Sequence, residues 1–526
     1  MTSSARPYLA ATAIASLFVT LSLSAHENAV PGSTASQASA AAASAPASEK
    51  PNATAIDRAA ANIAASETEL RHAYDAAGWK ALWSDSSRRA LTQALAGRNR
   101  HGLDHASFLA ADAASGSPQK TDIAYTRAAL AYADALARGA VDPAELHEIY
   151  TVKRPDVDLG PALAKALAAV TLAQWLDSLA PGDAEYRALS DAYIAASNAK
   201  GDAEPKIALA NSIHVGDRDP RVADIAAQLI DDGYLTARPA DASGQIYAQP
   251  IADAVKQMQR DYGIADDGIV GPATLAVLNV SPTDRARALA VGLERRRWLS
   301  RTPPATRIDV NTAAADLHYY RDGTMTDHRK VIVGEPGRET PQLASPIYRL
   351  VANPTWTIPK SIQNTELKNV GASYLRAHNM KMRDGWIVQQ PGPKNALGLV
   401  KFDMQNNQAI YLHDTSAPSL FDRSQRHLSH GCVRVSDALG FAAMLAEQEG
   451  VGEEWRKAHE SGDYTIVKLP RQIPVRLLYH NVFTQDDGRV AYRTDPYGWN
   501  DAVATKLGFA AKGANRAKAE AIDVGP

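Results

Sequence analysis

The protein is a chain of 526 residues, which is too long for one hydrophobic core, so we expect two to four domains. Its formal net charge is −2 and 45% of its residues are hydrophobic, as in an ordinary soluble protein. Proteins that bind nucleic acid carry a basic excess on one face, and nothing in this composition indicates nucleic acid as a partner. The function must therefore be found in local motifs.

Residues 1–25 are typical of a signal peptide. Arg6 supplies a positive charge, and the stretch YLAATAIASLFVTLSLSA that follows is apolar, uncharged and ends in small residues. Cleavage near Ala25 is expected, with an uncleaved membrane anchor as the alternative. Both interpretations export the rest of the chain, in which no later stretch is long and apolar enough to span a membrane.

Residues 26–56 are rich in Ala, Ser and Pro and nearly lack large apolar side chains, so we expect a disordered linker. Residues 57–243 are rich in Ala, and Pro and Gly break them into helical segments. Within the stretch 121–140 one apolar stripe carries Ile123, Leu130, Ala133 and Ala137. We predict a helical scaffold domain in which the sequence indicates no chemistry.

Residues 244–281 form a compact predicted unit. A helix from Pro250 has one apolar face, which carries Ile251, Val255, Met258 and Tyr262. A turn-rich loop, DDGIVGP, precedes a second helix, and its glycines are free to take positive φ. The unit resembles a small three-helix peptidoglycan-binding domain through Asp267, Gly268, Val270, Gly271, Pro272 and Thr274. It departs from that pattern at KQMQ (256–259), where the family usually carries an aromatic residue. The alternative interpretation is an ordinary helix-turn-helix packing unit that binds no ligand.

Residues 282–305 predict a basic amphipathic helix, which we interpret as a solvated connector. From residue 306 to 526 the pattern changes to strand-like runs separated by Gly, Pro and Asp turns, with hairpin turns at RDGT and QDDGR. Residues 361–398 interrupt these runs with a long polar segment, and insertions of this size are usually functional. We expect a mainly β domain with an inserted cap that forms a lid over its cleft.

The only cysteine of the chain, Cys432, lies in the stretch HLSHGCVRV. A thiol attacks only as the thiolate, so it needs a base or a cation nearby. His430 is two residues away, and Gly431 allows a sharp turn in which backbone N–H groups can form an oxyanion hole. A helix predicted from Ser436 would place the cysteine before a helix N-terminus and favour the thiolate modestly.

Three other interpretations of this thiol were weighed. A buried, inert cysteine fits poorly with the polar surroundings of SHGC. A zinc site made of His413, His427, His430 and Cys432 lacks the usual ligand spacings and an HExxH motif, so we expect no metal and no cofactor. A papain-like protease would carry a CGSCW-type signature, which is missing.

The segment is similar to the signature of the L,D-transpeptidase family. His413 is followed by fifteen residues and then by Ser429, His430, Gly431 and Cys432, with Arg434 two residues further on. The order of exported helical scaffold, peptidoglycan-binding module and capped catalytic domain resembles the large Gram-negative members, as do the segments NPTWTIP and QPGPKNALGLVKF. The expected fold is therefore a multidomain α+β protein in the periplasm, associated with the cell wall.

The resemblance implies a role for each site residue. Cys432 would attack the carbonyl of the meso-diamino acid in a tetrapeptide stem, releasing D-alanine, and a second stem would resolve the thioester into a 3→3 cross-link. His430 would be the base, oriented by the Ser429 backbone carbonyl, and Gly431 and Cys432 would supply oxyanion N–H groups. Tyr411 would add an oxyanion donor, and His413 and Arg434 would line the site and hold the carboxylates of the stem, with a purely structural role as the alternative for all three. Trp386 would be an aromatic residue of the cap or the cleft, and for Trp356 core packing is favoured.

The resemblance also implies covalent inhibition by carbapenems and leaves contacts with other wall-synthesis enzymes possible. Three alternatives to cross-linking use the same domain. An L,D-carboxypeptidase would pass the acyl group to water, and lipoprotein attachment would pass it to a lysine. An inactive wall-binding protein would keep the β domain as a relic, which the intact SHGC argues against.

Overall fold

The computed structural model describes residues 54–58, 63–64, 66–199, 207–237 and 245–513, with gaps between them. The predicted signal peptide and all but the last three residues of the predicted linker lie outside this part of the chain. Those last residues are ordered differently from the prediction: Ala55 forms a β-bridge with Lys80, and Ile56 is buried in the helical core. In the described part, no helix is long and apolar enough to cross a bilayer.

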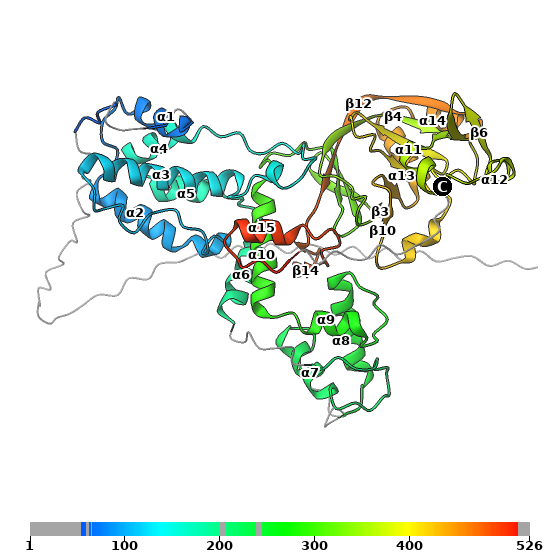
Figure 1. The fold of residues 1–526 in the computed structure, drawn as a ribbon, viewed down its shortest axis with the longest axis horizontal. Helices are drawn as coiled ribbons and strands as arrows, with labels where there is room; N and C mark the ends of the chain where they lie inside the picture. Colours follow the sequence, from blue (N-terminus) through cyan, green and yellow to red (C-terminus); the bar gives the residue numbers. More distant parts are fainter. Residues whose placement is uncertain (1–53, 59–62, 65, 200–206, 238–244, 514–526) are drawn as a thin grey trace, which may run out of the picture. The chain divides into compact units, whose positions relative to one another are not determined.

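The first region is a set of helices around one core, as predicted (Figure 1). Its central helix, α3 (Pro118–Arg138), begins with a Ser117 cap and buries the predicted stripe of Ile123, Leu130, Ala133 and Ala137. The other elements are α1 (Thr68–Ala76), α2 (Asp85–Ala96), η1 (Arg98–His101), η2 (Pro143–Glu145), α4 (Leu159–Ala168), α5 (Leu172–Leu179) and α6 (Ala184–Asn198).

The predicted connector helix is part of this core, so the expectation that it is solvated is wrong. Helix α10 (Pro282–Arg297) packs against α6 and against α15 (Asn500–Lys506) near the C-terminus. Its Leu289, Val291 and Leu293 are buried in the helical core. The arginines that suggested a solvated face include two that are fully buried, since they find partners inside the protein.

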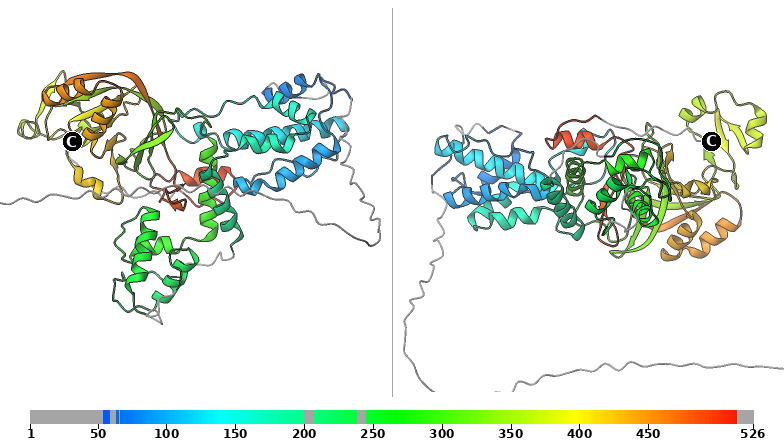
Figure 2. Two further views of the ribbon diagram at one scale, coloured as in Figure 1. Left: turned by 180° about the vertical axis from the view of Figure 1, so that it is seen from behind. Right: turned by 90° about the horizontal axis from the view of Figure 1, so that it is seen from below.

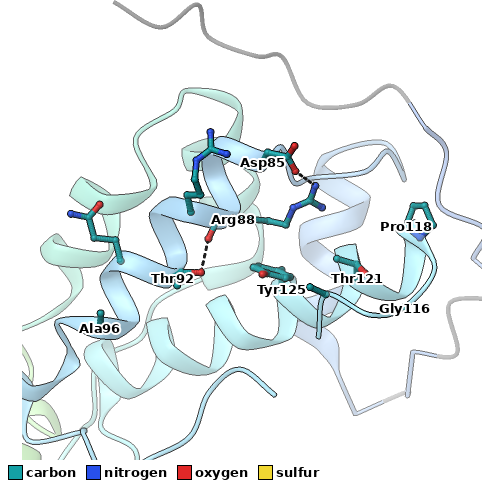
Figure 3. Close-up of a pocket in the computed structure, with 11 residues that line it drawn as sticks. Asp85, Arg88, Thr92, Ala96, Gly116, Pro118, Thr121 and Tyr125 are labelled. Carbon is teal, nitrogen blue, oxygen red and sulfur yellow. Dashed lines mark hydrogen bonds and ion pairs between the residues drawn. The ribbon is translucent and has the colours of Figure 1, made fainter. Parts of the chain in front are cut away.

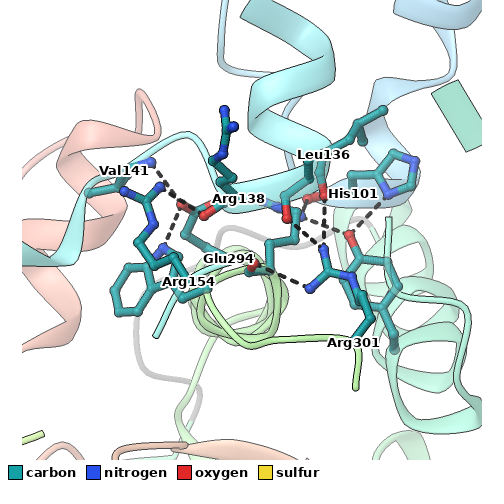
Figure 4. Close-up of polar contacts among 11 residues, drawn as sticks. His101, Leu136, Arg138, Val141, Arg154, Glu294 and Arg301 are labelled. Atoms are coloured by element: carbon teal, nitrogen blue, oxygen red, sulfur yellow. Dashed lines mark hydrogen bonds and ion pairs between the residues drawn. The ribbon is translucent and has the colours of Figure 1, made fainter. Parts of the chain in front are cut away.

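These partners form a buried polar network around Glu294 (Figure 4). Glu294 accepts hydrogen bonds from Arg297 Nη2 at 2.6 Å, from the Val141 N–H at 2.8 Å and from the Trp298 indole at 3.0 Å. Arg297 also donates to the Tyr186 hydroxyl at 2.8 Å. A buried charge without such partners would destabilise the fold by several kcal/mol, on the order of 3–5. The charged residues of α10 therefore tie the helices together instead of facing solvent.

The peptidoglycan-binding-like unit begins earlier in the chain than predicted. Its core joins α7 (Val222–Asp231), α8 (Gln249–Tyr262) and α9 (Pro272–Leu278) and includes Ile207 and Ile213. The predicted boundary at residue 244 lies just before α8. Helix α7 precedes this boundary, but it buries its apolar face against α8 and α9. Residues from 207 therefore belong to this unit and not to the scaffold. The face of α8 that was predicted to be apolar is buried.

The β domain is a nine-stranded sheet in the order β10-β3-β11-β9-β8-β4-β12-β1-β2. Strand β2 also pairs with β3, which closes the sheet on itself and confirms the hairpin at RDGT. The strands are β1 (Arg307–Asn311), β2 (Asp316–Arg321), β3 (Thr324–Gly334), β4 (Ala344–Ala352), β8 (Val400–Met404), β9 (Leu412–His413), β10 (His427–Ser429), β11 (Val433–Val435) and β12 (Thr465–Leu478). A 3₁₀ turn, η4, covers Pro418–Asp422.

Two helices complete the core of this domain. Helix α13 (Ala438–Gln448) contributes Phe441 and Leu445, and α14 (Gly452–Glu460) contributes Trp455. They pack on the strands as a covering layer, seen from two further directions in Figure 2. The domain is thus mainly β, and these two helices bury apolar side chains of its sheet.

The catalytic-type domain does not extend to residue 526, as the prediction had it. After β12 the chain forms a hairpin of β13 (Val482–Thr484) and β14 (Val490–Tyr492) around the predicted turn QDDGR, and then α15. Val482, Val503 and Leu507 are buried in the helical core with α10. This C-terminal segment therefore returns to the scaffold, because its apolar side chains complete that core and not the core of the sheet.

The insertion folds as a small domain of its own, with helices α11 (Lys360–Thr365) and α12 (Ala372–Ala377). Its three-stranded sheet has the order β5-β7-β6, made of β5 (Trp356–Thr357), β6 (Met380–Arg383) and β7 (Trp386–Gln389). Trp356, Ile362, Met380 and Leu397 share a separate core. We refer to residues 356–398 as the cap.

Candidate active site

The pairing of two short strands brings the separated parts of the motif together. Strands β9 and β11 run parallel, with Leu412 opposite Val433 and His413 opposite Arg434. The Val433 N–H donates to the Tyr411 carbonyl at 3.1 Å, which sets Tyr411 beside Cys432. The fifteen-residue spacer in the sequence is therefore the connection between two neighbouring strands, and it places the imidazole and the guanidinium at one register position.

The turn before Cys432 requires a glycine. Gly431 has a φ of 110°, a region that residues with a side chain rarely adopt, although there is room around its α-carbon. Its carbonyl accepts a hydrogen bond from Thr340 Oγ1 at 2.9 Å. Ser429 Oγ donates to the Cys432 carbonyl at 2.5 Å and accepts the Gly431 N–H at 3.2 Å. These bonds fix the turn that presents the thiol.

The thiol faces a cavity of about 360 Å³ between the sheet and the cap. Six of the predicted site residues line it: Tyr411, His413, Ser429, His430, Cys432 and Arg434. The cap contributes Trp356, Ile362 and Glu366 to the opposite side. The prediction that the insertion covers the cleft thus agrees with the lining of this cavity, while its action as a moving lid stays a prediction.

A larger hollow of about 740 Å³ lies in the helical region (Figure 3). It is lined by residues of α2 and α3, among them Arg88 and Tyr125, and Arg88 forms an ion pair with Asp85. Its lining contains no thiol and no imidazole. Size alone therefore does not identify the reactive site; the nucleophile and the base do.

The groups around Cys432 have opposite effects on the pKa of its thiol. Burial raises the pKa of the Cys432 thiol, while hydrogen bonds from Tyr411 and the charges of Lys401 and Arg434 lower it. The pKa remains above its ordinary value, so the thiol is mostly protonated at neutral pH. Burial next to the thiol also raises the pKa of Tyr411 well above its usual range, which keeps this phenol protonated as a donor.

His413 and Arg434 differ in what they offer a ligand. Burial lowers the pKa of His413 to about 3, with a further contribution from Arg434, so its imidazole is neutral. We expected both residues to hold stem carboxylates, and a neutral His413 cannot do this by charge. Arg434 is 8% exposed, and its Nε has no hydrogen-bond partner among the described residues. The guanidinium is thus the cation available to an anionic ligand.

The predicted role of the Ser429 carbonyl is not the one seen. That carbonyl accepts the Glu335 N–H at 2.8 Å. The His430 ring instead bonds through Nε2 to Glu366 Oε1 at 2.7 Å, and Glu366 comes from the cap. Sequence patterns do not predict this contact, because Glu366 lies 64 residues from His430 in an insertion without a recognisable motif. The Gly431 N–H is likewise engaged by Ser429 Oγ, which leaves the Cys432 N–H as the expected oxyanion donor of the turn.

The helix predicted from Ser436 is present, since α13 begins at Ala438 with Asp437 as its N-cap, but strand β11 lies between Cys432 and this helix. The expected place of Trp386 in the cleft is wrong. Trp386 does not line the cavity; it is 39% exposed on β7, with the Lys360 ammonium over its ring. Trp356, for which core packing is the favoured prediction, packs in the cap core and also lines the cavity.

Of the residues considered for a zinc site, His413 and His430 line the cavity with Cys432, and His427 does not. His427 is buried, bonds to the Thr312 carbonyl at 2.9 Å and lies against Tyr497, outside the cavity lining. Among the described residues, the metal-ligating side chains that approach one another are Glu69, His72 and Asp158, in the helical region.

The motif of the peptidoglycan-binding-like unit holds its own loop. Gln259, the second glutamine of KQMQ, donates to Asp267 Oδ1 at 3.0 Å and to Thr274 Oγ1 at 3.1 Å, and it accepts the Gly268 N–H at 2.8 Å. Gly268 has the expected positive φ, whereas Gly271 is extended and precedes Pro272, the first residue of α9. These hydrogen bonds shape the loop.

A thiol and two imidazoles share a cavity of the β domain, and comparison with known proteins specifies the type of this domain. Residues 305–459 match the L,D-transpeptidase catalytic domain, residues 68–192 match the scaffold domain, and residues 218–278 match a "Putative peptidoglycan binding domain". The chain therefore carries an L,D-transpeptidase catalytic domain together with the scaffold and peptidoglycan-binding domains predicted beside it.

A relative from Haemophilus influenzae, described as a "Putative L,D-transpeptidase", is 31% identical over 219 residues. The match covers 37% of this chain and 45% of that protein, which is less than half of its length. An L,D-transpeptidase from Stackebrandtia nassauensis is 16% identical, with 51% of this chain and 94% of that chain covered and a TM-score of 0.22. An L,D-transpeptidase in complex with imipenem is 14% identical, with 33% and 59% covered and a TM-score of 0.18.

Proposed function

We propose that this protein is a peptidoglycan L,D-transpeptidase that forms 3→3 cross-links through a thioester on Cys432. The observation that carries the proposal is the shared cavity, which brings a thiol, an imidazole and a buried guanidinium together in an L,D-transpeptidase catalytic domain. The thiol supplies the nucleophile, His430 the base and Arg434 a cation for the carboxylates of the stem peptide.

The proposed reaction has two acyl transfers. His430 takes the proton of the Cys432 thiol as sulfur attacks the carbonyl of the meso-diamino acid in a tetrapeptide donor. The bond to D-alanine breaks, His430 returns the proton to the leaving amine, and a thioester remains. The side-chain amine of a second stem then attacks the thioester, its C–S bond breaks, and His430 passes the proton of the amine to the leaving sulfur, which regenerates the thiol. The Cys432 N–H and the Tyr411 hydroxyl are the donors we assign to the oxyanion in both steps.

Purified tetrapeptide stems test this proposal when the products are analysed by mass. Cross-linked dimers with release of D-alanine are the expected result. Tripeptides alone would show an L,D-carboxypeptidase, which uses the same residues with water as acceptor, and transfer to a lysine peptide would show lipoprotein attachment. No product from the intact chain would favour a wall-binding protein without activity and would refute the proposal.

We further propose that residues 207–278 bind the wall and that the chain acts in the periplasm. The match to a peptidoglycan-binding domain supports the first statement, and the apolar stretch after Arg6 supports the second. Removing residues 207–278 is expected to reduce sedimentation with insoluble peptidoglycan while activity on small soluble stems is retained, because this unit has a core of its own and no nucleophile. Equal sedimentation of both proteins would contradict the assignment.

A further inference from the structure

The cap carries a positive charge that the chain as a whole does not. Residues 356–398 contain six Lys or Arg side chains and two carboxylates, Glu366 and Asp384, so the cap has a formal net charge of +4 in a chain whose net charge is −2. The six cationic side chains are all exposed: Lys360, Lys368, Arg376, Lys381, Arg383 and Lys394. The ion pairs of Glu366 go to Arg338 and His430, which lie outside the cap. The cap therefore presents a positive surface to solvent.

Part of this charge lies beside one indole. In the hairpin of β6 and β7, Arg383 is directly opposite Trp386, and Lys381 lies two residues before Arg383. Side chains of directly opposite residues point to the same face of a sheet, as do side chains two residues apart, so these three share one face. The Lys360 ammonium lies 4.4 Å from the centre of the Trp386 ring. Three cations therefore flank an indole that is 39% exposed.

The same surface adjoins the cavity that contains the thiol. Pro359 and Ser361, the chain neighbours of Lys360, both line the cavity, while Lys360 itself is exposed. Strand β7 pairs with β5, whose Trp356 and Thr357 also line the cavity. A long ligand that lies on this face of the hairpin can therefore extend a branch into the cavity.

We propose that Lys360, Lys381, Arg383 and Trp386, which we call the cap face, bind the peptidoglycan strand whose stem peptide enters the cavity. The inference rests on the proposed function, because it takes peptidoglycan as the substrate. A peptidoglycan strand carries carboxylates on its stems and sugar rings along its backbone. The cations of the cap face attract the carboxylates, and the exposed indole offers an apolar surface to a sugar ring. An anionic lipid surface would also attract these cations, but it has no branch that could occupy the cavity at the same time.

The experiment measures binding of the full chain to insoluble peptidoglycan by sedimentation, as a titration at low salt. The double variant Lys381→Glu/Arg383→Glu is expected to raise the apparent Kd by about tenfold, the lower end of what electrostatic attraction adds to association. The matched control is Lys457→Glu/Lys468→Glu, which changes the net charge by the same amount at two exposed lysines outside the cap. The control should change the Kd by less than about twofold, since its charges lie away from the cap face.

Two further measurements identify the interactions. Peptidoglycan whose carboxylates have been converted to amides should bind the unchanged protein about as weakly as the double variant binds the native polymer, and the double variant should lose little more on it. The difference between the double variant and the unchanged protein should shrink as salt is added, because exposed charges are screened. Trp386→Ala should raise the Kd at low and at high salt, since contact with a sugar ring does not depend on charge.

The proposal is overturned if Lys381→Glu/Arg383→Glu or Trp386→Ala binds peptidoglycan as the unchanged protein does, if the control loses as much, or if amidation of the polymer has no effect. Vesicles with anionic lipid provide the competing outcome: a double variant that loses only vesicle binding would assign the cap face to a membrane. An unaltered midpoint of thermal unfolding shows that each variant is folded. A failure of the proposed function is separate, because the intact chain would then form no products from small soluble stems while these binding results stood.

Discussion

Replacement of Cys432 by alanine is expected to abolish both turnover of stem peptides and formation of a covalent carbapenem adduct. The thiol is the nucleophile of the proposed reaction, and the chain has no second cysteine that can take its place. The strained lactam carbonyl of a carbapenem is open to attack by an activated thiolate, so the unchanged protein should gain the mass of one inhibitor molecule. Intact-protein mass spectrometry after exposure measures the adduct directly.

A chelator provides the control for this experiment. The cavity holds one thiol and two imidazoles, of which His413 is buried and neutral, and the proposed chemistry uses no metal ion. Treatment with a chelator should therefore leave adduct formation unchanged. An adduct that persists in Cys432→Ala, or activity that disappears with the chelator, would show that the nucleophile or the mechanism has been assigned wrongly.

His430→Ala is expected to slow acylation of Cys432 by about a hundred- to ten-thousandfold at neutral pH, the usual contribution of a general base. The direction of the pH dependence follows from the thiol. Burial raises the pKa of Cys432, so without a base the thiol stays protonated at neutral pH and thiolate appears only as the pH rises toward that value. The rate of carbapenem acylation in His430→Ala should therefore increase with pH over a range in which the unchanged protein is already fast. Acylation of His430→Ala at the unchanged rate would remove His430 from the role of base.

The sequence alone determined the candidate nucleophile, its neighbours and the class of the domain. Cys432, His430 and Gly431 lie within three consecutive positions, and local chemistry decides what such a stretch can do. Fifteen residues separate His413 from Ser429 in the sequence. In the fold, the strands that carry His413 and Arg434 are parallel neighbours. Helices such as α3 and α8 could be predicted because their apolar residues recur with helical periodicity, which depends on nearby residues only.

The tertiary structure decided the features that depend on residues far apart in the sequence. The arginines of α10 suggested a solvent-exposed helix, but Arg297 is buried against Tyr186, and its neighbour Glu294 is bonded to the distant Val141 N–H. The C-terminal hairpin and α15 belong to the scaffold because that core, formed by the first part of the chain, accepts their apolar side chains. Glu366 reached His430 across 64 residues through the fold of the cap. Sequence patterns report local preference, whereas burial and pairing between distant segments are settled only when the whole chain packs.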